Sequence, residues 1–579
     1  MKKTLLLLLL CLLFQQTNAQ TFIGGGGPIP DNQTPIFFPL TVTSVPQTSL
    51  SSSFGIESVC LNITHGYVGD LNIFLIAPDN TYIELTTGNG GGGQNYNNTC
   101  LSDLSPNVIT SGNAPFSGSY RPESPLYVVN NGLNPNGQWQ LYILDSYPQD
   151  AGILNSWSIT FGPNTGQPFP FTSSNLPIVK INTMGNSIVD EPKVMANMQI
   201  IDNGAGIRNY ITDTVYTYDG HIGIEVRGSS SQTFPKKSFG FETWDSTGLE
   251  IDTSILGFPK ESDWILNANY TDKSFLRNVT PYHLFNQMGR YASRTKYVEV
   301  FINNVYAGLY VFMEKVKRDN NRVNIATVDP DDLAGDSLTG GYIIKVDKLT
   351  GESGTTWNSN YSNEVVFQFH DPESDELQAQ QIAYITSYVS NFEQAIQANP
   401  EGAYLQWIEP ISFYDFFILQ ELGRTVDGYR SSSFMYKDKN SGDFQGRLVA
   451  GPMWDFNLSY GNADYCDAFL TTGWQYNFDQ ICNFTTQIPF WWNRLLDAPS
   501  YRNGLRCRWN ELREGPLSTD SIHFWIDSMT NLLEDGRIRN FQQWPIIGQY
   551  INWNAFVGNT YEEDVDFFKT YIETRALWL

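Results

Sequence analysis

Two stretches in the second half of the chain decide the fold prediction: residues 426–437 read VDGYRSSSFMYK, and residues 451–458 read GPMWDFNL. The first follows an apolar segment, 410–423, that predicts a buried helix. An aspartate such as Asp427, at the start of a loop after a buried helix, can accept a hydroxyl proton, or it can simply end the helix. Asp455 lies among apolar residues, so its carboxylate needs a partner, either a metal ion or backbone N–H groups.

A third stretch precedes these two. Arg227-Gly228-Ser229-Ser230-Ser231 is followed by Phe234-Pro235-Lys236-Lys237-Ser238-Phe239. Small residues let backbone N–H groups approach a phosphate, and a lysine on the next strand can reach phosphate oxygens. The same residues also suit an ordinary hairpin turn. Because side chains alternate along a strand, only one of the two lysines is expected to face a cleft.

The regions around these stretches divide the chain into two parts. Residues 37 to about 162 contain many short apolar runs between Gly, Asn, Asp and Pro turns, which indicates an all-β sandwich or jelly roll. From Leu176 onward the pattern is mixed. Strands are predicted at 178–182, 220–227, 237–243, 297–302, 307–313 and 340–347, and helices at 273–288, 375–397, 410–423, 489–512, 518–537 and 562–578.

The first 19 residues have the pattern of a secretory signal. Lys2 and Lys3 precede the apolar run 5–14, and Thr17-Asn18-Ala19 is a plausible cleavage site. The run is too short to span a membrane, so we expect a secreted, extracytoplasmic protein without a membrane span. The chain has 35 Lys and Arg against 60 Asp and Glu, a formal charge of −25. This charge argues against a general nucleic-acid binder, which needs a surplus of cations.

Five cysteines follow the predicted signal, and export permits disulfides. Cys60 with Cys100 and Cys466 with Cys482 are plausible pairs that would leave Cys507 over, although connectivity does not follow from sequence alone. The acidic loop 328–336, VDPDDLAGD, lacks the spacing of an EF-hand, and we interpret it as a solvated turn.

Residues 45–162 resemble the P domain (P/Homo B domain) of proprotein convertases. The resemblance is carried by His65-Gly66-Tyr67-Val68-Gly69-Asp70-Leu71, Ala77-Pro78-Asp79, the stretch 115–122 (PFSGSYRP), Asn136-Gly137-Gln138-Trp139, and Asp145, Asp150, Gly152, Leu154 and Trp157. It implies a β jelly roll that can hold Ca²⁺, with Asp70 as a calcium ligand and Asp145 and Asp150 as weaker candidates. The alternative is that these aspartates cap turns. The chain shows no subtilisin-like histidine block or nucleophile turn, so the domain is expected to lack its usual protease.

Residues 177–579 resemble the spore-coat CotH kinase family. Lysine strand, acid loop and second acid follow in the order of a kinase, and further blocks match at 275–278, 308–314, 340–347 and 452–462. The resemblance implies an atypical, protein-kinase-like α+β fold that transfers phosphate from ATP to Ser or Thr of secreted or surface proteins with Mg²⁺ or Mn²⁺. Related fungal surface members act as adhesins.

The resemblance assigns roles to single residues. Asp427 matches the catalytic Asp, which would orient or deprotonate the acceptor hydroxyl, and Asp455 matches the metal Asp. Lys237 is the first choice for the phosphate lysine and Lys236 the alternative. Arg227, Gly228 and Ser229 would contact the nucleotide phosphates. Glu314 ends a strand where the adenine would pass, and its role there is through the backbone or the side chain.

Two departures keep a non-catalytic alternative open. A kinase has Asn five residues after its catalytic Asp, and Ser432 stands there instead. The Ser432 hydroxyl can bind Mg²⁺, but as a weaker ligand, and Asn457 or Asp464 could supply the missing oxygen. The predicted helix 273–288 contains no Glu to pair with the lysine, and Arg277 is its conspicuous charge. A pseudokinase that serves as an adhesin or scaffold is therefore the alternative, and an accessory role to a secreted protease is a weaker one. The predicted organisation is signal peptide 1–19, leader linker 20–44, P domain 45–162, linker 163–176 and kinase-like domain 177–579.

Overall fold

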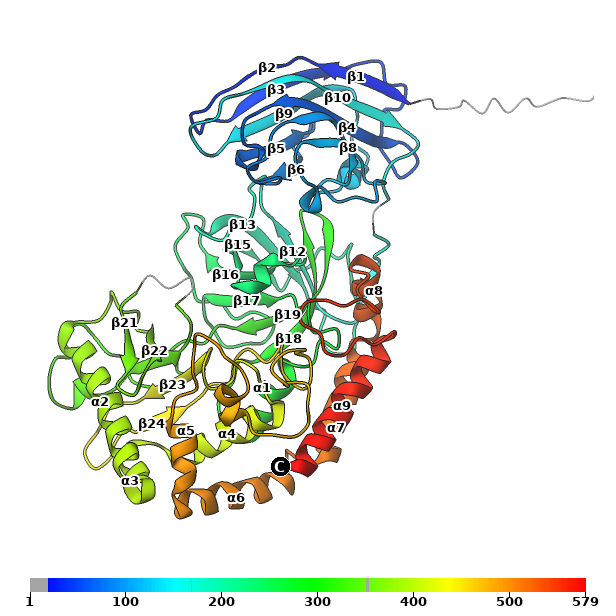
Figure 1. Cartoon of the computed structure of the whole chain (residues 1–579). Helices are drawn as coiled ribbons and strands as arrows, with labels where there is room; N and C mark the ends of the chain where they lie inside the picture. The colour runs from blue at the N-terminus through cyan, green and yellow to red at the C-terminus, as the bar shows by residue number, and fades with distance from the viewer. Residues whose placement is uncertain (1–18, 168, 350–353) are drawn as a thin grey trace, which may run out of the picture. The chain divides into compact units, whose positions relative to one another are not determined.

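The computed structural model describes residues 19–167, 169–349 and 354–579. The predicted signal segment, apart from Ala19, therefore lies outside the described residues. The chain forms two compact units (Figure 1). The first comprises residues up to Phe171 with two short returns, Asn182–Ser187 and Ile302–Tyr306, and the second comprises Thr172–Ile181, Ile188–Phe301 and Ala307–Leu579. The boundary between the two units lies between Phe171 and Thr172, within the range 163–176 predicted as a linker.

The first unit is built from two β-sheets. One has the order β1 (Gln20–Gly24), β10 (Gly152–Gly162), β4 (Gly55–Thr64), β7 (Tyr96–Leu101) and β8 (Phe116–Tyr120), with β2 (Gly27–Ile29) also pairing with β10. The other has the order β3 (Ile36–Val42), β9 (Gly137–Asp145), β5 (Leu71–Ile76) and β6 (Tyr82–Thr87). Buried side chains from both sheets share one apolar core, which includes Trp139 and Trp157.

The structure corrects the prediction of an irregular leader over residues 20–44. β1, β2 and β3 occupy much of this range, and β1 and β2 pair with β10 while β3 pairs with β9. In β3, Phe38, Leu40 and Val42 are buried and the residues between them are exposed. This period-2 alternation is typical of a half-buried strand, but Gly24–Gly27 and the prolines around it made the region resemble a linker.

Both predicted disulfides are present. Cys60 and Cys100 are opposite each other in the register of β4 and β7 and are bonded, and Cys466 is bonded to Cys482. Cys507 is the free, exposed cysteine of the described residues. The second disulfide joins cysteines that are 16 positions apart, and residues near each of them line the cavity described below.

The second unit begins with a closed β-barrel. Its order is β12 (Ile178–Asn182), β13 (Val194–Ile201), β15 (Tyr218–Arg227), β16 (Ser238–Trp244), β17 (Asp263–Asn267), β19 (Val305–Glu314) and β18 (Thr295–Ile302). The short strands β11 (Ser173–Ser174) and β14 (Asn209–Tyr210) pair separately. The strands predicted at 178–182, 220–227, 237–243, 297–302 and 307–313 correspond to five of these elements, with boundaries that differ by at most a few residues.

A second sheet and the helices complete this unit. The sheet has the order β21 (Thr356–Ser359), β22 (Ser362–Asp371), β20 (Tyr342–Val346), β23 (Ser433–Lys437) and β24 (Leu448–Ala450). The helices are α1 (Val279–Gln287), α2 (Ala379–Ala398), α3 (Pro400–Trp407), α4 (Pro410–Gly423), α5 (Trp491–Arg494), α6 (Pro499–Arg513), α7 (Thr519–Leu532), α8 (Glu534–Gln543) and α9 (Tyr561–Trp578). The unit is therefore mixed α and β, as predicted.

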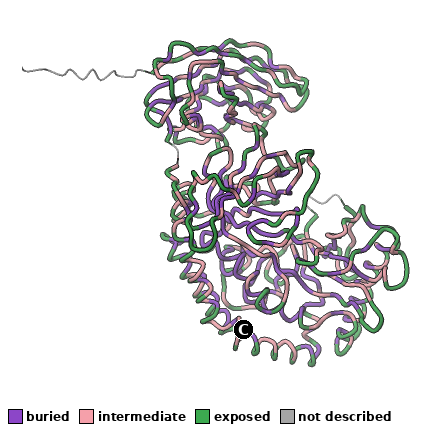
Figure 2. Tube along the Cα trace, turned by 180° about the vertical axis from the view of Figure 1, so that it is seen from behind, coloured by how far each residue is buried: buried purple, intermediate pink, exposed green. Residues whose placement is uncertain are grey.

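The helix α4 is buried on all sides and positions the loop that follows it. Every residue from Ser412 to Gly423 is buried, as expected for a helix that is apolar around its whole circumference. Figure 2 shows this buried interior running through the second unit. No helix in the described part of the chain is long and apolar enough to cross a membrane.

The predicted helix 273–288 is shorter than expected. α1 starts at Val279, because residues 272–278 form a turn around the Asp272 carboxylate. Arg277 precedes the helix and donates to Asp272 at 2.7 Å. Its guanidinium also lies 5.4 Å from the centre of the Phe568 ring, so Arg277 ties this turn to α9.

Candidate active site

The loops that follow β20, α4 and β24, together with residues 484–486, line one cavity of ≈ 210 Å³. The loop after α4 contains Asp427, and the loop after β24 contains Asp455. The structure thus brings together two acids that are 28 residues apart in the sequence. The residues that line the cavity are Asp347, Lys348, Asp427, Arg430, Ser431, Ser432, Asp455, Tyr465, Phe484, Thr485 and Thr486.

Asp427 is held at the cavity by the arginine three residues further on. α4 ends at Gly423, and Arg424 takes a left-handed conformation that turns the chain (φ 44°). Arg430 Nη2 then lies 2.8 Å from Asp427 Oδ1, with the Arg430 side chain 5% exposed and that of Asp427 32% exposed. Arg430 Nε also donates to the Val426 carbonyl at 3.0 Å. The Asp427 carboxylate is therefore oriented but still open to the cavity, as an acceptor of a substrate proton must be.

Asp455 is half-buried and has a strongly perturbed acidity. Its backbone is in the left-handed region (φ 62°), and its N–H donates to the Tyr282 hydroxyl at 3.1 Å. Burial, together with the negative charges of Asp427 and Asp347, raises the pKa of Asp455 to about 7. Lys348 and Arg227 oppose this shift without cancelling it. A carboxylate that is disfavoured in this way has a strong affinity for a cation.

Asp347 is a third acid in the cavity, and the sequence interpretation did not assign it a role. It follows β20 directly, where Val346 pairs with Ser433 of β23. Its carboxylate accepts the backbone N–H groups of Lys348, at 2.9 Å, and of Ser432. Burial raises the pKa of Asp347. Asp347 therefore links the end of one central strand to the loop that carries Asp427; the signal in the sequence was an acid at the end of a buried apolar strand.

The residues predicted to contact phosphates lie in part near these acids. Arg227 ends β15, and its guanidinium lies 5.7 Å from the centre of the Trp454 ring. The guanidinium also interacts electrostatically with the Asp455 carboxylate. Burial lowers the pKa of Arg227, and Asp455 opposes that shift. Gly228 has a φ of 110°, and a Cβ there would lie 1.9 Å from Ser231 Oγ, so glycine is required at this turn. Gly228 and Ser229 are exposed and do not line the cavity.

Neither predicted phosphate lysine lines the cavity. Lys236 is the buried member of the pair, and its ammonium donates to the Ala268 carbonyl at 2.8 Å, to the Leu309 carbonyl at 2.5 Å and to Asn540 Oδ1 at 2.9 Å. Burial holds the pKa of Lys236 well below its usual value. Lys237 Nζ donates to the Gln232 carbonyl at 2.6 Å. The alternation expected along the strand is present, but the inward lysine points into a packed interior.

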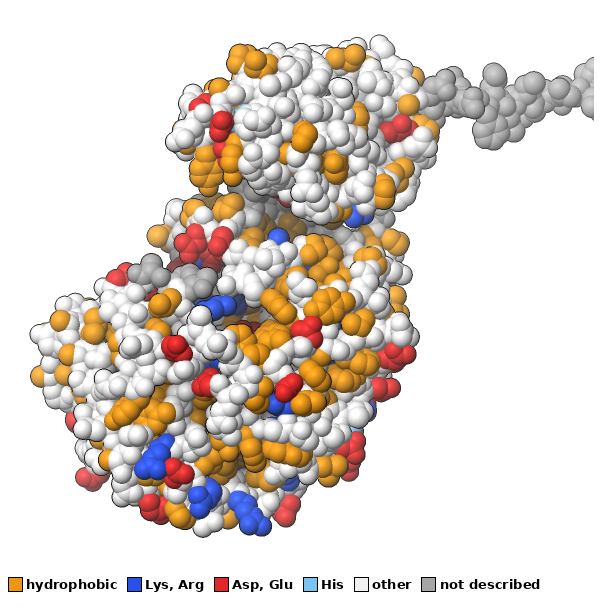
Figure 3. All heavy atoms as spheres, in the orientation of Figure 1, with side chains coloured by type: hydrophobic (Ala, Val, Ile, Leu, Met, Phe, Trp, Pro, Cys, Tyr) orange, Lys and Arg blue, Asp and Glu red, His pale blue; other side chains and the backbone are white. Residues whose placement is uncertain are grey.

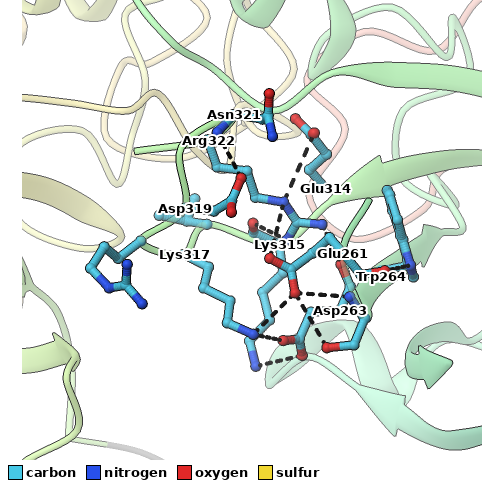
Figure 4. Close-up of polar contacts among 12 residues, drawn as sticks. Glu261, Asp263, Trp264, Glu314, Lys315, Lys317, Asp319, Asn321 and Arg322 are labelled. Carbon is cyan, nitrogen blue, oxygen red and sulfur yellow. Dashed lines mark hydrogen bonds and ion pairs between the residues drawn. The ribbon is translucent and has the colours of Figure 1, made fainter. Parts of the chain in front are cut away.

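Glu314 ends β19 as predicted, and its side chain is fully engaged in a polar network (Figure 4). The carboxylate accepts from the Arg294 backbone N–H at 2.9 Å and from the Tyr291 hydroxyl at 3.2 Å. It also pairs with the Arg294 guanidinium, and the Arg322 Nε lies 3.9 Å away. Lys317, three residues beyond the end of the same strand, pairs with Asp263 at 2.7 Å. The Glu314 side chain therefore holds the segment between α1 and β18, which leaves only its backbone for a ligand.

Of the three candidates for the missing metal-ligand oxygen, Ser432, Asn457 and Asp464, only Ser432 lies at the cavity. Ser432 lines the cavity, with its backbone in the left-handed region (φ 48°). Asn457 does not line it, and Asp464 is exposed and accepts from the Tyr550 hydroxyl at 2.5 Å. Within the described ranges, no three His, Cys, Asp or Glu side chains are grouped closely enough to hold a metal ion alone. Mg²⁺, however, is usually held by one or two carboxylates together with substrate phosphates, and Asp455 and Asp347 fit that requirement.

In the first unit, Asp70 lies among other acids. Asp145 is buried, with one oxygen 3.1 Å from His65 Nε2 and the other without a hydrogen-bond partner among the described residues. Burial, then the charge of Asp145, raises the pKa of Asp70, and Asp150 and Asp31 act in the same direction. The three aspartates predicted from the P-domain resemblance are thus close enough to influence one another.

The surface of the chain agrees with its low content of charged residues, 16%. Figure 3 shows most of this face as uncharged or apolar, with acidic and basic side chains in small separate groups. No broad basic area of the kind that binds a nucleic-acid backbone is visible on the face shown.

The fold and the cavity define a two-unit protein whose mixed α and β unit carries a cavity lined by three aspartates. Residues 224–579 match the family model described as CotH kinase protein, and residues 57–161 match that of the proprotein convertase P-domain. The first match covers more than half of the chain, and the chain belongs to the CotH kinase protein family.

Two curated proteins share a part of the chain. It is 29% identical over 150 residues to leupeptin-inactivating enzyme 1 of Streptomyces exfoliatus, covering 24% of this chain and 28% of that protein. It is 29% identical over 142 residues to the transglutaminase-activating metalloprotease of Streptomyces mobaraensis, covering 24% of this chain and 15% of that protein. The chain thus spans less than a third of the length of either relative.

Among solved structures, the serine protease of Aeromonas sobria matches both in complex with its chaperone and alone. The identity is 16% in both cases, with TM-scores of 0.16 and 0.15. The matches cover 26% of this chain and 28% of that chain for the complex, and 25% and 26% for the protease alone. TM-scores this low do not define a shared fold.

Proposed function

We propose that this protein is an exported phosphotransferase that moves the γ-phosphoryl group of ATP to Ser or Thr hydroxyls of secreted or surface proteins. The observation that carries the proposal is the convergence of Asp427 and Asp455, with Asp347, on one cavity. Membership of the CotH kinase protein family supports it.

The roles follow from the chemistry of each side chain. Asp427, oriented by Arg430 and open to the cavity, accepts the proton of the acceptor hydroxyl. Asp455 and Asp347 supply hard oxygen ligands for Mg²⁺ or Mn²⁺, which when bound neutralises charge on the nucleotide phosphates. Arg227, whose guanidinium interacts with Asp455, provides positive charge beside the same phosphates. In this arrangement Arg227 carries the electrostatic role that the sequence interpretation gave to Lys237.

The finer fold assignments belong to the same proposal. We assign the second unit a protein-kinase-like fold, in which the barrel and the second sheet stand on either side of the nucleotide. We assign the first unit a P-domain jelly roll with one Ca²⁺ at Asp70, Asp145 and Asp150. The unpartnered oxygen of the buried Asp145 supports this ion, since a buried carboxylate oxygen without a donor is costly.

The proposal is tested by incubating the full chain with labelled ATP, Mg²⁺ or Mn²⁺ and acceptor proteins. Transfer to protein is expected, and Asp427→Asn and Asp455→Asn are each expected to reduce it strongly. Asp464→Asn is the matched control, because Asp464 is an exposed aspartate outside the cavity, and it is expected to keep full activity. Equal rates in all four proteins, or no transfer in any, would refute the proposal.

A non-catalytic scaffold or adhesin is the second candidate, and one observation favours it. Lys236 is held by three acceptors and does not line the cavity, so the kinase-type lysine is missing from its place. Nucleotide binding without turnover would support this candidate. A role as an accessory to a secreted protease is a weaker inference, which rests on the P-domain match and on partial similarity to two proteins named as an inactivating enzyme and a metalloprotease.

A further inference from the structure

One wall of the cavity is a hydroxyl-bearing segment of the chain itself. Thr485 and Thr486 line the cavity together with Asp427 and Asp455. Thr485 is exposed and Thr486 is half-buried. They follow the Cys466–Cys482 disulfide by only a few residues, so this wall is anchored by a covalent bond. The candidate base, the candidate metal ligand and two alcohol groups therefore share one small space.

Arg430 connects this segment to the candidate base. Its Nη2 lies 2.8 Å from Asp427 Oδ1, and its Nη1 donates to Thr486 Oγ1 at 3.0 Å. The centre of its guanidinium lies 3.8 Å from that of the Phe484 ring. One planar cation thus bridges the Asp427 carboxylate and the Thr486 hydroxyl, while stacking on the residue that precedes the threonine pair. This arrangement places the threonines on the side of the cavity where an acceptor hydroxyl is needed.

We infer that the Thr485–Thr486 pair is a phosphorylation site that the protein's own active site modifies intramolecularly from ATP. The inference rests on the proposed function and names a substrate for it. A threonine Oγ attacks the γ-phosphorus, so the Oγ–P bond forms and the bond from the γ-phosphorus to the β,γ-bridging oxygen breaks. ADP leaves, and the hydroxyl proton passes to the Asp427 carboxylate.

The surroundings of the product favour the reaction. A phosphothreonine carries close to two negative charges and three acceptor oxygens, and it forms charge-assisted hydrogen bonds with arginine. Arg430 already contacts Thr486, and Lys348 lines the same cavity. The phosphate would compete with Asp427 for the Arg430 guanidinium, so the modification is expected to slow later transfer to other proteins.

The chain contains a matched internal control. Thr471 and Thr472 form a second Thr-Thr pair, inside the loop that the Cys466–Cys482 disulfide closes, and they do not line the cavity. Thr472 is exposed and Thr471 is half-buried, so both pairs present hydroxyls of comparable accessibility. The pair at 485–486 lines the cavity with Asp427 and the pair at 471–472 does not.

The experiment is a time course of the full chain with ATP and Mn²⁺, followed by phosphosite mapping. No Lys or Arg lies between residues 448 and 493, so trypsin would leave both pairs on one peptide, whereas cleavage before Asp479 separates them. The proteins compared are wild type, Thr485→Val with Thr486→Val, Thr471→Val with Thr472→Val, and Asp427→Asn. Each is checked for an unchanged thermal transition, and an unrelated acceptor protein is added in parallel.

We expect phosphate on the fragment that starts at Asp479, approaching one per chain, at a rate per chain that dilution does not change. The Thr485→Val, Thr486→Val protein should lose this phosphate, and the Thr471→Val, Thr472→Val protein should behave as wild type. Transfer to the added acceptor without phosphate at residues 485–486 would overturn the inference and leave the proposed function standing. A rate per chain that falls on dilution would also overturn it, and no transfer to any protein would overturn both.

Discussion

The raised pKa of Asp455 predicts that divalent cations bind this protein with a steep pH dependence. A carboxylate must lose its proton to bind a metal, and the pKa of Asp455 is about 7. At about pH 5, two units lower, only ~1% of Asp455 is ionised, so Mn²⁺ should bind ~100-fold more weakly than at pH 8, a difference of ~2.7 kcal/mol. With an ordinary aspartate pKa near ~4 the change would be less than ~2-fold.

The assay is a titration of the full chain with Mn²⁺ alone, read by electron paramagnetic resonance at several pH values. Mn²⁺ without nucleotide avoids the titration of the nucleotide phosphates. Asp455→Asn should lose both the binding and its pH dependence, whereas Asp464→Asn, outside the cavity, should keep both. The reasoning is refuted if the wild-type affinity is constant between about pH 5 and 8, or if Asp455→Asn binds as wild type does.

The same shift has a consequence for the metal-free protein. Because the pKa of Asp455 is raised, the folded state holds a proton that the unfolded state releases between about pH 4 and 7. The contribution of Asp455 to stability therefore falls as the pH rises through this window. Asp455→Asn should remove that part of the pH dependence, which thermal denaturation without metal can measure in parallel.

Three further predictions concern other residues. Lys236→Met should lower the urea midpoint of the second unit, because it leaves three acceptors unpaired at a cost of about 1–3 kcal/mol each, whereas Lys237→Met should change it little; equal effects would contradict this difference. Asp347→Asn keeps an oxygen that can accept the loop N–H, so it should weaken Mn²⁺ binding ~10-fold and leave the thermal midpoint unchanged. Asp347→Ala should lower both the Mn²⁺ affinity and the thermal midpoint. An Asp347→Asn protein with full Mn²⁺ affinity would exclude Asp347 as a ligand. Ca²⁺ should raise the thermal midpoint of wild type but not of Asp145→Asn, with the exposed Asp79→Asn as control; a wild type indifferent to Ca²⁺ and chelator would contradict the site.

The elements of the fold were predictable because their patterns are local. The apolar stretch 410–423 gives a helix buried on all sides, and 340–347 gives a central strand. The leader was misjudged because Gly and Pro around residues 23–30 obscured the alternation in β3. The boundaries of α1 were misjudged because the turn around Asp272 depends on side-chain hydrogen bonds, which periodicity does not reveal.

The candidate site was predictable only in part, because the cavity is assembled from segments far apart in the chain. The apolar contexts of Asp427 and Asp455 identified both acids, and the structure places them in one cavity, while their catalytic roles stay predictions. Asp347 has one local signal, an acid at the end of a buried apolar strand, whereas Thr485 has none that separates it from ordinary loop residues. For Lys236, alternation predicts an inward direction but does not distinguish a cleft from a packed interior.

The burial of Lys236 also determines how the second unit must fold. Its ammonium joins the segment after β17, strand β19 and Asn540 of α8, which is more than 300 positions later in the chain. A truncation before α8 would remove one of the three acceptors of the Lys236 ammonium. The barrel is therefore not an independent module onto which the helices were added, and we expect it to unfold in the same cooperative transition as the C-terminal helices. A nascent chain would accordingly complete the barrel only after the final helices have emerged from the ribosome.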